Sequence, residues 1–169
     1  MNAFQRRVER DGMPGQVIHV GMDYWQRTLV LNRSGFRPKL CADPESLSTV
    51  LTGTGTVDAV VISESPELDV SQVTDLVRSV ASCPVILFPL EHDEYDEGKY
   101  DLVVQSLTPP DKWVQAIGAT IRRFQETCQR SQLLGRESAE AREASRLQRE
   151  RSETLIESGR KLPGNICPE

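Results

Sequence analysis

DAVVIS, residues 58–63, and PVILF, residues 84–88, are the two stretches that decide the fold. Both are short, nearly continuous apolar runs without the alternation of apolar and polar residues that is typical of a half-exposed strand. Strands of this kind are found in parallel sheets that helices cover on both faces. The two runs therefore predict the centre of an α/β sandwich.

Three further short runs complete a five-stranded pattern around this centre. We expect strands at 17–20, 39–42 and 102–104, separated by helix-length amphipathic segments. Right-handed crossovers between such strands give a doubly wound parallel sheet whose crevice lies at the carboxyl ends of the strands. The predicted fold class is therefore α/β, with five parallel strands.

The segments between the strands contain start and stop signals of helices. Residues 24–34 end before Gly35, a residue common just after a helix. Asp43-Pro44 supplies an N-cap and a first-turn proline, and residues 69–81 have apolar residues at helical spacing. The sequence Thr108-Pro109-Pro110-Asp111 opens the last helix, with Thr108 as its N-cap. An apolar stripe should close this helix over the sheet, and it consists of Trp113, Ile117, Ile121 and Phe124.

The connection between the fourth and fifth strands differs from the other connections. Residues 89–101 contain six carboxylates and Gly98, and they leave little room for a full helix. We therefore expect an acidic loop or one irregular turn, so that the fourth helix of the fold is shortened.

Composition excludes several classes of function. The net charge of −5 argues against broad binding to a phosphate backbone, so nucleic acid is not an expected partner. No apolar run is long enough for a membrane span, and none follows the N-terminal arginines as it would in a signal peptide. We expect a cytoplasmic protein. The four cysteines and two histidines show no metal-ligand spacing, so no metal or other cofactor is predicted.

The order of these elements resembles a response-regulator receiver domain of the CheY-like, flavodoxin-like type. The resemblance covers about residues 14–127 and is carried by the fivefold βα order, Gly35-Phe36 and the strands at 58–62 and 83–88. In that family two carboxylates after the first strand hold Mg²⁺, and an aspartate at the end of the third strand accepts the phosphoryl group. A hydroxyl after the fourth strand and a lysine after the fifth bind the new phosphate.

This sequence has other residues at all the corresponding positions. The degenerate positions are Gly21, Met22 and Asp23 after the first strand, Ser63 or Glu64 at the third, Pro89 at the fourth, and Gln105 or Ser106 at the fifth. Neither Ser63 nor Glu64 can form an aspartyl phosphate. The resemblance therefore implies a degenerate pseudo-receiver.

The chain is expected to have three parts. Residues 1–14 form a flexible N-terminal segment, 15–128 the receiver-like domain, and 129–169 a charged helical extension with a disordered end. In the extension, Ser131, Ser138, Ser145 and Ser152 recur every seven residues. A parallel series three residues later consists of Leu134, Ala141, Gln148 and Leu155. This small and polar seam is weak for a coiled coil, so two interpretations stay open: a solvated helix, or an interface for a weak homodimer or a partner helix.

The predicted function is that of a phosphorylation-independent protein–protein interaction module in bacterial two-component-type phosphorelay signal transduction, not an enzyme. The expected partner is another signalling protein. One alternative is a phosphoacceptor response regulator that uses the displaced acids Asp23 and Glu64, and Glu64 could also mimic a phosphorylated acceptor. Another is a small hydrolase with Ser63 as nucleophile and His92 as base. His19, inside the first strand, is expected to be structural.

Overall fold

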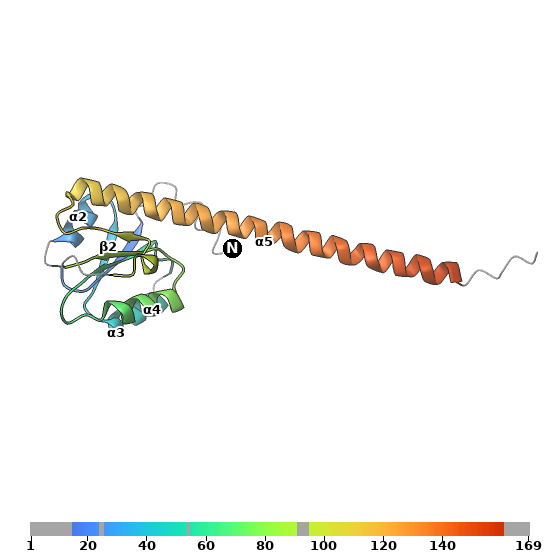
Figure 1. Cartoon of the computed structure of the whole chain (residues 1–169), viewed down its shortest axis with the longest axis horizontal. Coiled ribbons are helices and arrows are strands. Elements are labelled where there is room, and N and C mark those ends of the chain that lie inside the picture. Colours follow the sequence, from blue (N-terminus) through green and yellow to red (C-terminus); the bar gives the residue numbers. More distant parts are fainter. Residues whose placement is uncertain (1–14, 24–25, 54, 91–94, 161–169) are drawn as a thin grey trace, which may run out of the picture. The chain divides into compact units, whose positions relative to one another are not determined.

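The centre of the molecule is a five-stranded parallel sheet in the order β2-β1-β3-β4-β5 (Figure 1). The computed structural model describes residues 15–23, 26–53, 55–90 and 95–160. The strands are β1 (Gln16–Val20), β2 (Arg37–Cys41), β3 (Ala59–Ser63), β4 (Val85–Phe88) and β5 (Leu102–Val103). β1 and β3 are neighbours, with Val17 opposite Ala59 and Val20 opposite Ile62. The predicted α/β class and parallel five-stranded sheet are confirmed.

Helices cover both faces of the sheet. They are α2 (Arg27–Arg33), α3 (Pro44–Gly53), α4 (Val70–Val80) and α5 (Pro110–Arg160). One core cluster joins α3 and α4 to one face, with Leu47 and Val77 fully buried. The other joins α2 and the start of α5 to the opposite face through Leu31, Trp113 and Ile117 (Figure 1). The sheet is therefore doubly wound, and the four residues of β4 are buried on both faces as predicted.

The signals that predicted the helices are local capping contacts. An oxygen of Asp43 accepts a hydrogen bond from the amide of Ser46 at 2.7 Å. An oxygen of Asp69 accepts one from the amide of Gln72 at 3.0 Å at the start of α4. Such contacts satisfy amides that have no partner within the first turn of a helix. They depend on residues close in sequence, which is why these starts could be predicted.

Several predicted boundaries were wrong. β2 begins at Arg37 and not at 39, because the strand pairs with β1 from Gln16 onward. β5 ends at Val103, one residue earlier than predicted. α2 begins at Arg27, and residues 24–25 of the predicted first helix lie outside the described residues. α5 begins at Pro110, so Pro109 and not Thr108 directly precedes the helix.

The short connection after β4 contains one turn of 3-10 helix, Glu97–Lys99, in its described part. This agrees with the expected irregular turn, but Gly98 lies within the turn and does not prevent it. Arg78 of α4 fixes the end of the connection, because its Nη2 donates to the carbonyl of Lys99 at 3.1 Å and to Asp101 at 2.8 Å. The described part of the connection between β4 and β5 thus holds one turn of 3-10 helix in place of a full helix, so the predicted shortening is confirmed.

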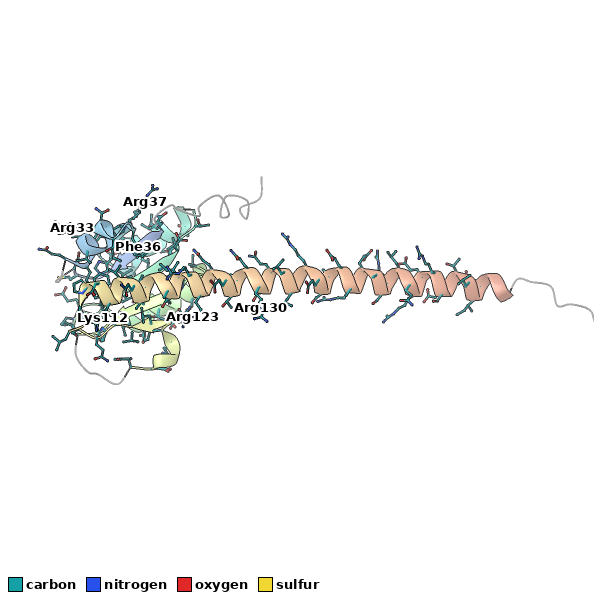
Figure 2. The ribbon with its side chains drawn as sticks, turned by 90° about the horizontal axis from the view of Figure 1, so that it is seen from above. Arg33, Phe36, Arg37, Lys112, Arg123 and Arg130 are labelled. Atoms are coloured by element: carbon teal, nitrogen blue, oxygen red, sulfur yellow. The ribbon has the colours of Figure 1, made fainter. Side chains whose placement is uncertain are left out.

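The chain divides into two compact units, and the boundary lies between Gln125 and Glu126. α5 runs through this division to Arg160, so the predicted long C-terminal helix is confirmed. All residues from 129 to 157 are exposed, and their side chains project around the helix (Figure 2). The segments 1–14 and 161–169, predicted to be flexible, lie outside the described residues. No helix within the described part is long and apolar enough to cross a membrane.

Candidate functional site

Ser63, the residue at the predicted phosphoacceptor position, is the last residue of β3 and is fully buried. Its hydroxyl oxygen lies 2.8 Å from Nη1 of Arg27, which donates a hydrogen bond to it. A second hydrogen bond of 2.6 Å joins the same oxygen to Nε2 of His19 in β1. The acceptor position is therefore occupied by a hydroxyl that has two protein partners and no contact with solvent.

Arg27, at the start of α2, places its guanidinium over the carboxyl end of the sheet. The residue is only 7% exposed, and its Cζ lies 4.2 Å from the centre of the Phe88 ring at the end of β4. The Phe88 ring in turn meets Trp113 of α5 edge-on, with ring centroids 5.4 Å apart. Burial lowers the pKa of Arg27 to about 10, although the nearby Asp23 carboxylate opposes this effect. The side chain is therefore still a cation at neutral pH.

His19 completes the cluster from β1. It is fully buried, and its Nδ1 lies 2.9 Å from the hydroxyl of Thr28 in α2. Its pKa is lowered to about 4, chiefly by burial; the Asp23 carboxylate opposes this shift, and the positive charge of Arg27 adds to it. The imidazole is therefore neutral at neutral pH and links β1, α2 and β3. We name the group of His19, Arg27 and Ser63 the buried cluster.

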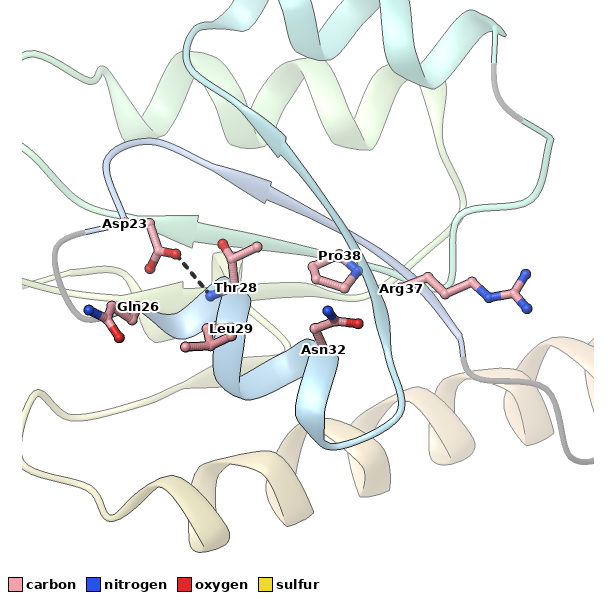
Figure 3. Close-up of a pocket in the computed structure, with 7 residues that line it drawn as sticks. All are labelled: Asp23, Gln26, Thr28, Leu29, Asn32, Arg37 and Pro38. Atoms are coloured by element: carbon pink, nitrogen blue, oxygen red, sulfur yellow. Dashed lines mark hydrogen bonds between the residues drawn. The ribbon is translucent and has the colours of Figure 1, made fainter.

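Asp23, the one carboxylate near the predicted acid pair, caps α2. Its two oxygens accept hydrogen bonds from the amides of Arg27 and Thr28, at 2.6 and 3.0 Å. Figure 3 shows the second of these bonds beside an open groove of about 560 Å³ between α2 and β2. Both oxygens of this carboxylate are thus occupied by the backbone of α2.

Gly21 stands where a receiver has the first of its two metal-binding carboxylates, and the backbone at this position favours glycine. Its φ is +94°, a conformation that residues with a Cβ atom rarely adopt. A Cβ atom at this position would collide with the backbone carbonyl oxygen of Ser63. The neighbouring Met22 is 47% exposed. The local backbone therefore leaves no space for a carboxylate at position 21.

The remaining predicted site residues lie at the same edge of the sheet but outside the buried cluster. Glu64 is half-buried, and its Oε2 accepts a hydrogen bond from the amide of Leu90 at 2.9 Å. Pro89 is buried, and its carbonyl accepts one from the hydroxyl of Ser106 at 3.0 Å. Gln105 is exposed, and its amide nitrogen lies 3.5 Å from the hydroxyl of Tyr95. His92, the predicted base, lies outside the described residues.

Sequence reasoning missed the role of Arg27 and treated His19 as structural only. Arg27 lies at the start of a helix, where an arginine is usually solvated. His19 carried a weak signal, because it is a polar residue within an apolar strand whose position is paired with Val61 of β3. A buried histidine needs a polar partner, and Ser63 at the end of the adjacent strand is that partner.

The predicted seam on α5 is exposed in the described chain. Leu134 is 55% and Leu155 73% exposed, and Ala141 and Gln148 are exposed as well. Leu133, Leu147 and Ile156 are further large apolar residues exposed on this part of the helix.

The chemistry open to the buried cluster is limited. A serine hydroxyl beside a neutral imidazole is the arrangement of an activated nucleophile, but Ser63 has no exposed surface for a substrate to reach. Within the described part of the chain, no group of three or more His, Cys, Asp or Glu side chains could hold a metal ion. The cluster is a buried polar network in which Arg27 is the one cation and the one member with any exposed surface.

Comparison with known proteins gives structural matches alone, since no family model and no curated protein matches the sequence. The N-terminal domain of a response regulator/sensory box/GGDEF three-domain protein from Carboxydothermus hydrogenoformans is 12% identical with a TM-score of 0.58, and the match covers 67% of this chain and 98% of that one. A CheY-like response regulator receiver domain protein from Methanospirillum hungatei JF-1 is 10% identical, with a TM-score of 0.57 and coverage of 68% and 98%.

A third match extends further along this chain. A fusion that contains the trimeric coiled coil of yeast Spc42 is 14% identical with a TM-score of 0.60, and the match covers 79% of this chain and 97% of that chain. At such identities the matches show the fold: the chain has a receiver-type sheet with flanking helices and a long C-terminal helix.

Proposed function

We propose that this chain is a phosphorylation-independent pseudo-receiver that acts as a protein–protein interaction module in two-component-type signal transduction. The proposal rests on the burial and the hydrogen bonds of Ser63. At the position where a receiver has its phosphoacceptor, this hydroxyl is fully buried and hydrogen-bonded to both Arg27 and His19. A phosphoryl donor has no path to it.

The surroundings of Ser63 also disfavour the metal ion that phosphotransfer requires. Mg²⁺ needs oxygen ligands in near-octahedral geometry, usually including carboxylates. Gly21 leaves no room for the first carboxylate, and Asp23 is bound to the amides of α2. The guanidinium of Arg27 beside Ser63 places a positive charge near the position that a divalent cation would take.

The two alternative functions have less support. A phosphoacceptor switch would use Asp23 or Glu64, and both carboxylates already accept backbone hydrogen bonds that would compete with a metal ion or a phosphoryl group. A hydrolase would need Ser63 to face a substrate, and its hydroxyl is buried. We therefore propose a non-enzymatic role.

The test is incubation with acetyl phosphate and Mg²⁺, followed by intact-mass measurement. The wild-type chain should gain no phosphoryl group. The Ser63→Asp variant should also stay unmodified, because it regains the acceptor but no metal ligands. A mass gain in the wild type would refute the proposal, and its loss in Asp23→Asn or Glu64→Gln would identify the displaced acceptor.

The exposed part of α5 supplies the surface that we propose for a protein partner, including a weak homodimer. Leu134 and Leu155 are more than half exposed on a helix that makes no described contact to cover them. A single isolated helix gains little stability from its own backbone, so association with a second helix would stabilise it. The match to a fusion with a trimeric coiled coil is consistent with this proposal.

A further inference from the structure

A group of exposed cations covers the domain where the end of α2 and the start of β2 pack against α5. Phe36 joins these elements, because a Cβ atom on Gly118 of α5 would lie 4.0 Å from its ring and 3.5 Å from Nη1 of Arg122. Figure 2 shows Arg33, Phe36 and Arg37 next to the part of α5 that belongs to the domain. We name the five exposed cations of this surface the basic face: Arg33, Arg37, Lys112, Arg122 and Arg123.

The two stretches of sequence that form the basic face contain no acidic residue. Residues 24–42 and 112–125 have no Asp or Glu, although the whole chain has 25 of them and a net charge of −5. The nearest carboxylates in sequence to the second stretch are those of Asp111 and Glu126 at its two ends. Among the described residues, no ion pair involves Arg33, Arg37 or Arg122. Their charges can therefore bind carboxylates of another molecule.

The open groove between α2 and β2 adds an apolar wall beside the basic face. Leu29 and Pro38 line the groove together with Arg37, and Leu29 is 42% exposed. Asp23 lies at the opposite end of the groove from Arg37 (Figure 3), with its oxygens bound to amides of α2. An apolar wall next to cations suits an acidic segment that also carries an apolar side chain.

The backbone of β2 disfavours the simplest way of binding an extended segment, which is the addition of a strand. β2 is an edge strand of the sheet, and the amide of Arg37 donates to the carbonyl of Gly15 on the side of β1. The next residue, Pro38, therefore faces the free edge, and it has no N–H for an added strand. A bound segment is thus held mainly by its side chains, and guanidinium groups pair well with carboxylates.

We propose that the basic face and the groove bind an acidic, extended segment of a partner protein. An apolar side chain of the segment lies against Leu29, and its carboxylates pair with the basic face. A nucleic acid or an anionic membrane would use the cations but not the apolar wall, and the net charge of −5 opposes the approach of either. The surface consists of residues of the first compact unit. It goes beyond the proposed function and does not depend on the loss of phosphotransfer.

The experiment measures binding of the full chain to a fluorescein-labelled peptide of Glu, Asp and two leucines by fluorescence anisotropy. The wild type should bind it saturably, and more weakly when sodium chloride is raised from about 50 to about 200 mM. Arg33→Glu combined with Arg37→Glu should weaken binding at least about tenfold. The matched control, Arg142→Glu combined with Arg151→Glu, makes the same change of net charge at exposed residues of the second unit and should bind like the wild type.

Two further variants test the other parts of the surface. Lys112→Glu combined with Arg122→Glu reverses charges on α5 and should also weaken binding, which keeps the test valid if the first variant does not fold. Leu29→Ser should weaken binding of the leucine-containing peptide and leave binding of a leucine-free peptide of equal charge unchanged.

Three results would overturn the inference. The first is equal affinity of the basic-face variants and the control, and the second is a leucine-free peptide that binds the wild type as tightly as the peptide with leucines. The third is tighter binding to phosphatidylserine vesicles or to duplex DNA that is lost in the basic-face variants, because the surface would then be a lipid or nucleic-acid site. The intact-mass result on phosphotransfer is unaffected by any of these outcomes.

Discussion

Lowering the pH should destabilise the domain through His19. In the folded chain burial holds the pKa of His19 near 4, compared with 6.5 for an ordinary histidine. Between these values the unfolded chain therefore binds a proton that the folded chain does not bind. Stability must fall as the pH is lowered from about 6.5 to about 4, with the sign set by linkage. Above this range the histidine is neutral in both states and has no such effect.

The expected magnitude follows from the two pKa values. Each unit of pKa difference corresponds to about 1.4 kcal/mol, so the gap between 6.5 and about 4 gives about 3 kcal/mol of unfolding free energy. A small domain has a total stability of about 5–15 kcal/mol. The loss is therefore large enough to measure.

Urea unfolding at about pH 7, 5.5 and 4 measures this effect directly. His19→Gln keeps a polar side chain in the buried cluster but removes the titrating group, and His92→Gln is the matched control. The wild type and His92→Gln should lose about 3 kcal/mol more than His19→Gln across the range, since carboxylate titration is common to all three. Equal losses in all three proteins, or an NMR titration of His19 with a midpoint near 6.5, would refute the reasoning.

Three further predictions concern the helix and one glycine. A chain that ends at Cys128 should keep its melting temperature within about 5 °C, because residues 129–157 are all exposed; a larger drop in a thermal melt would make the extension part of the domain. Leu134→Glu combined with Leu155→Glu should abolish any dimer seen by sedimentation while the circular dichroism stays unchanged, whereas a surviving dimer would place the interface elsewhere. Gly21→Ala should cost about 1–3 kcal/mol in chemical unfolding because its φ is positive. Gly53→Ala is the control, because no atom lies near its Cβ position. Similar losses of unfolding free energy in both variants would contradict backbone strain at position 21.

The fold could be predicted because its signals are local in sequence. The buried strands are continuous apolar runs, and Asp43 and Asp69 cap the helices that follow them. The exact ends of strands were less predictable, because a strand ends where pairing with its neighbour ends. Arg37 of β2, for example, is a strand residue through its pairing with Gln16 of β1, and no local pattern in the sequence indicates this.

The candidate site was predictable in position but not in its contacts. The position of Ser63 follows from the end of an apolar strand, and such strand ends meet at one edge of a parallel sheet. The contact with Arg27 joins residues 36 positions apart, and it depends on how α2 begins. The positive φ of Gly21 was also unpredictable, since glycine adopts both signs of φ with similar ease.

The buried cluster has consequences for any attempt to restore phosphotransfer in this chain. Replacing Ser63 with aspartate places the new carboxylate against Arg27, where an ion pair forms in place of a metal site. Removing Arg27 frees the carboxylate, but it also removes the cation that contacts Phe88 and, through it, Trp113. A second metal ligand would still be missing, because a side chain at Gly21 collides with the Ser63 carbonyl. Several coupled backbone and side-chain changes are therefore needed, and this coupling is a physical reason to propose a fixed interaction module and not a switch with a single missing residue.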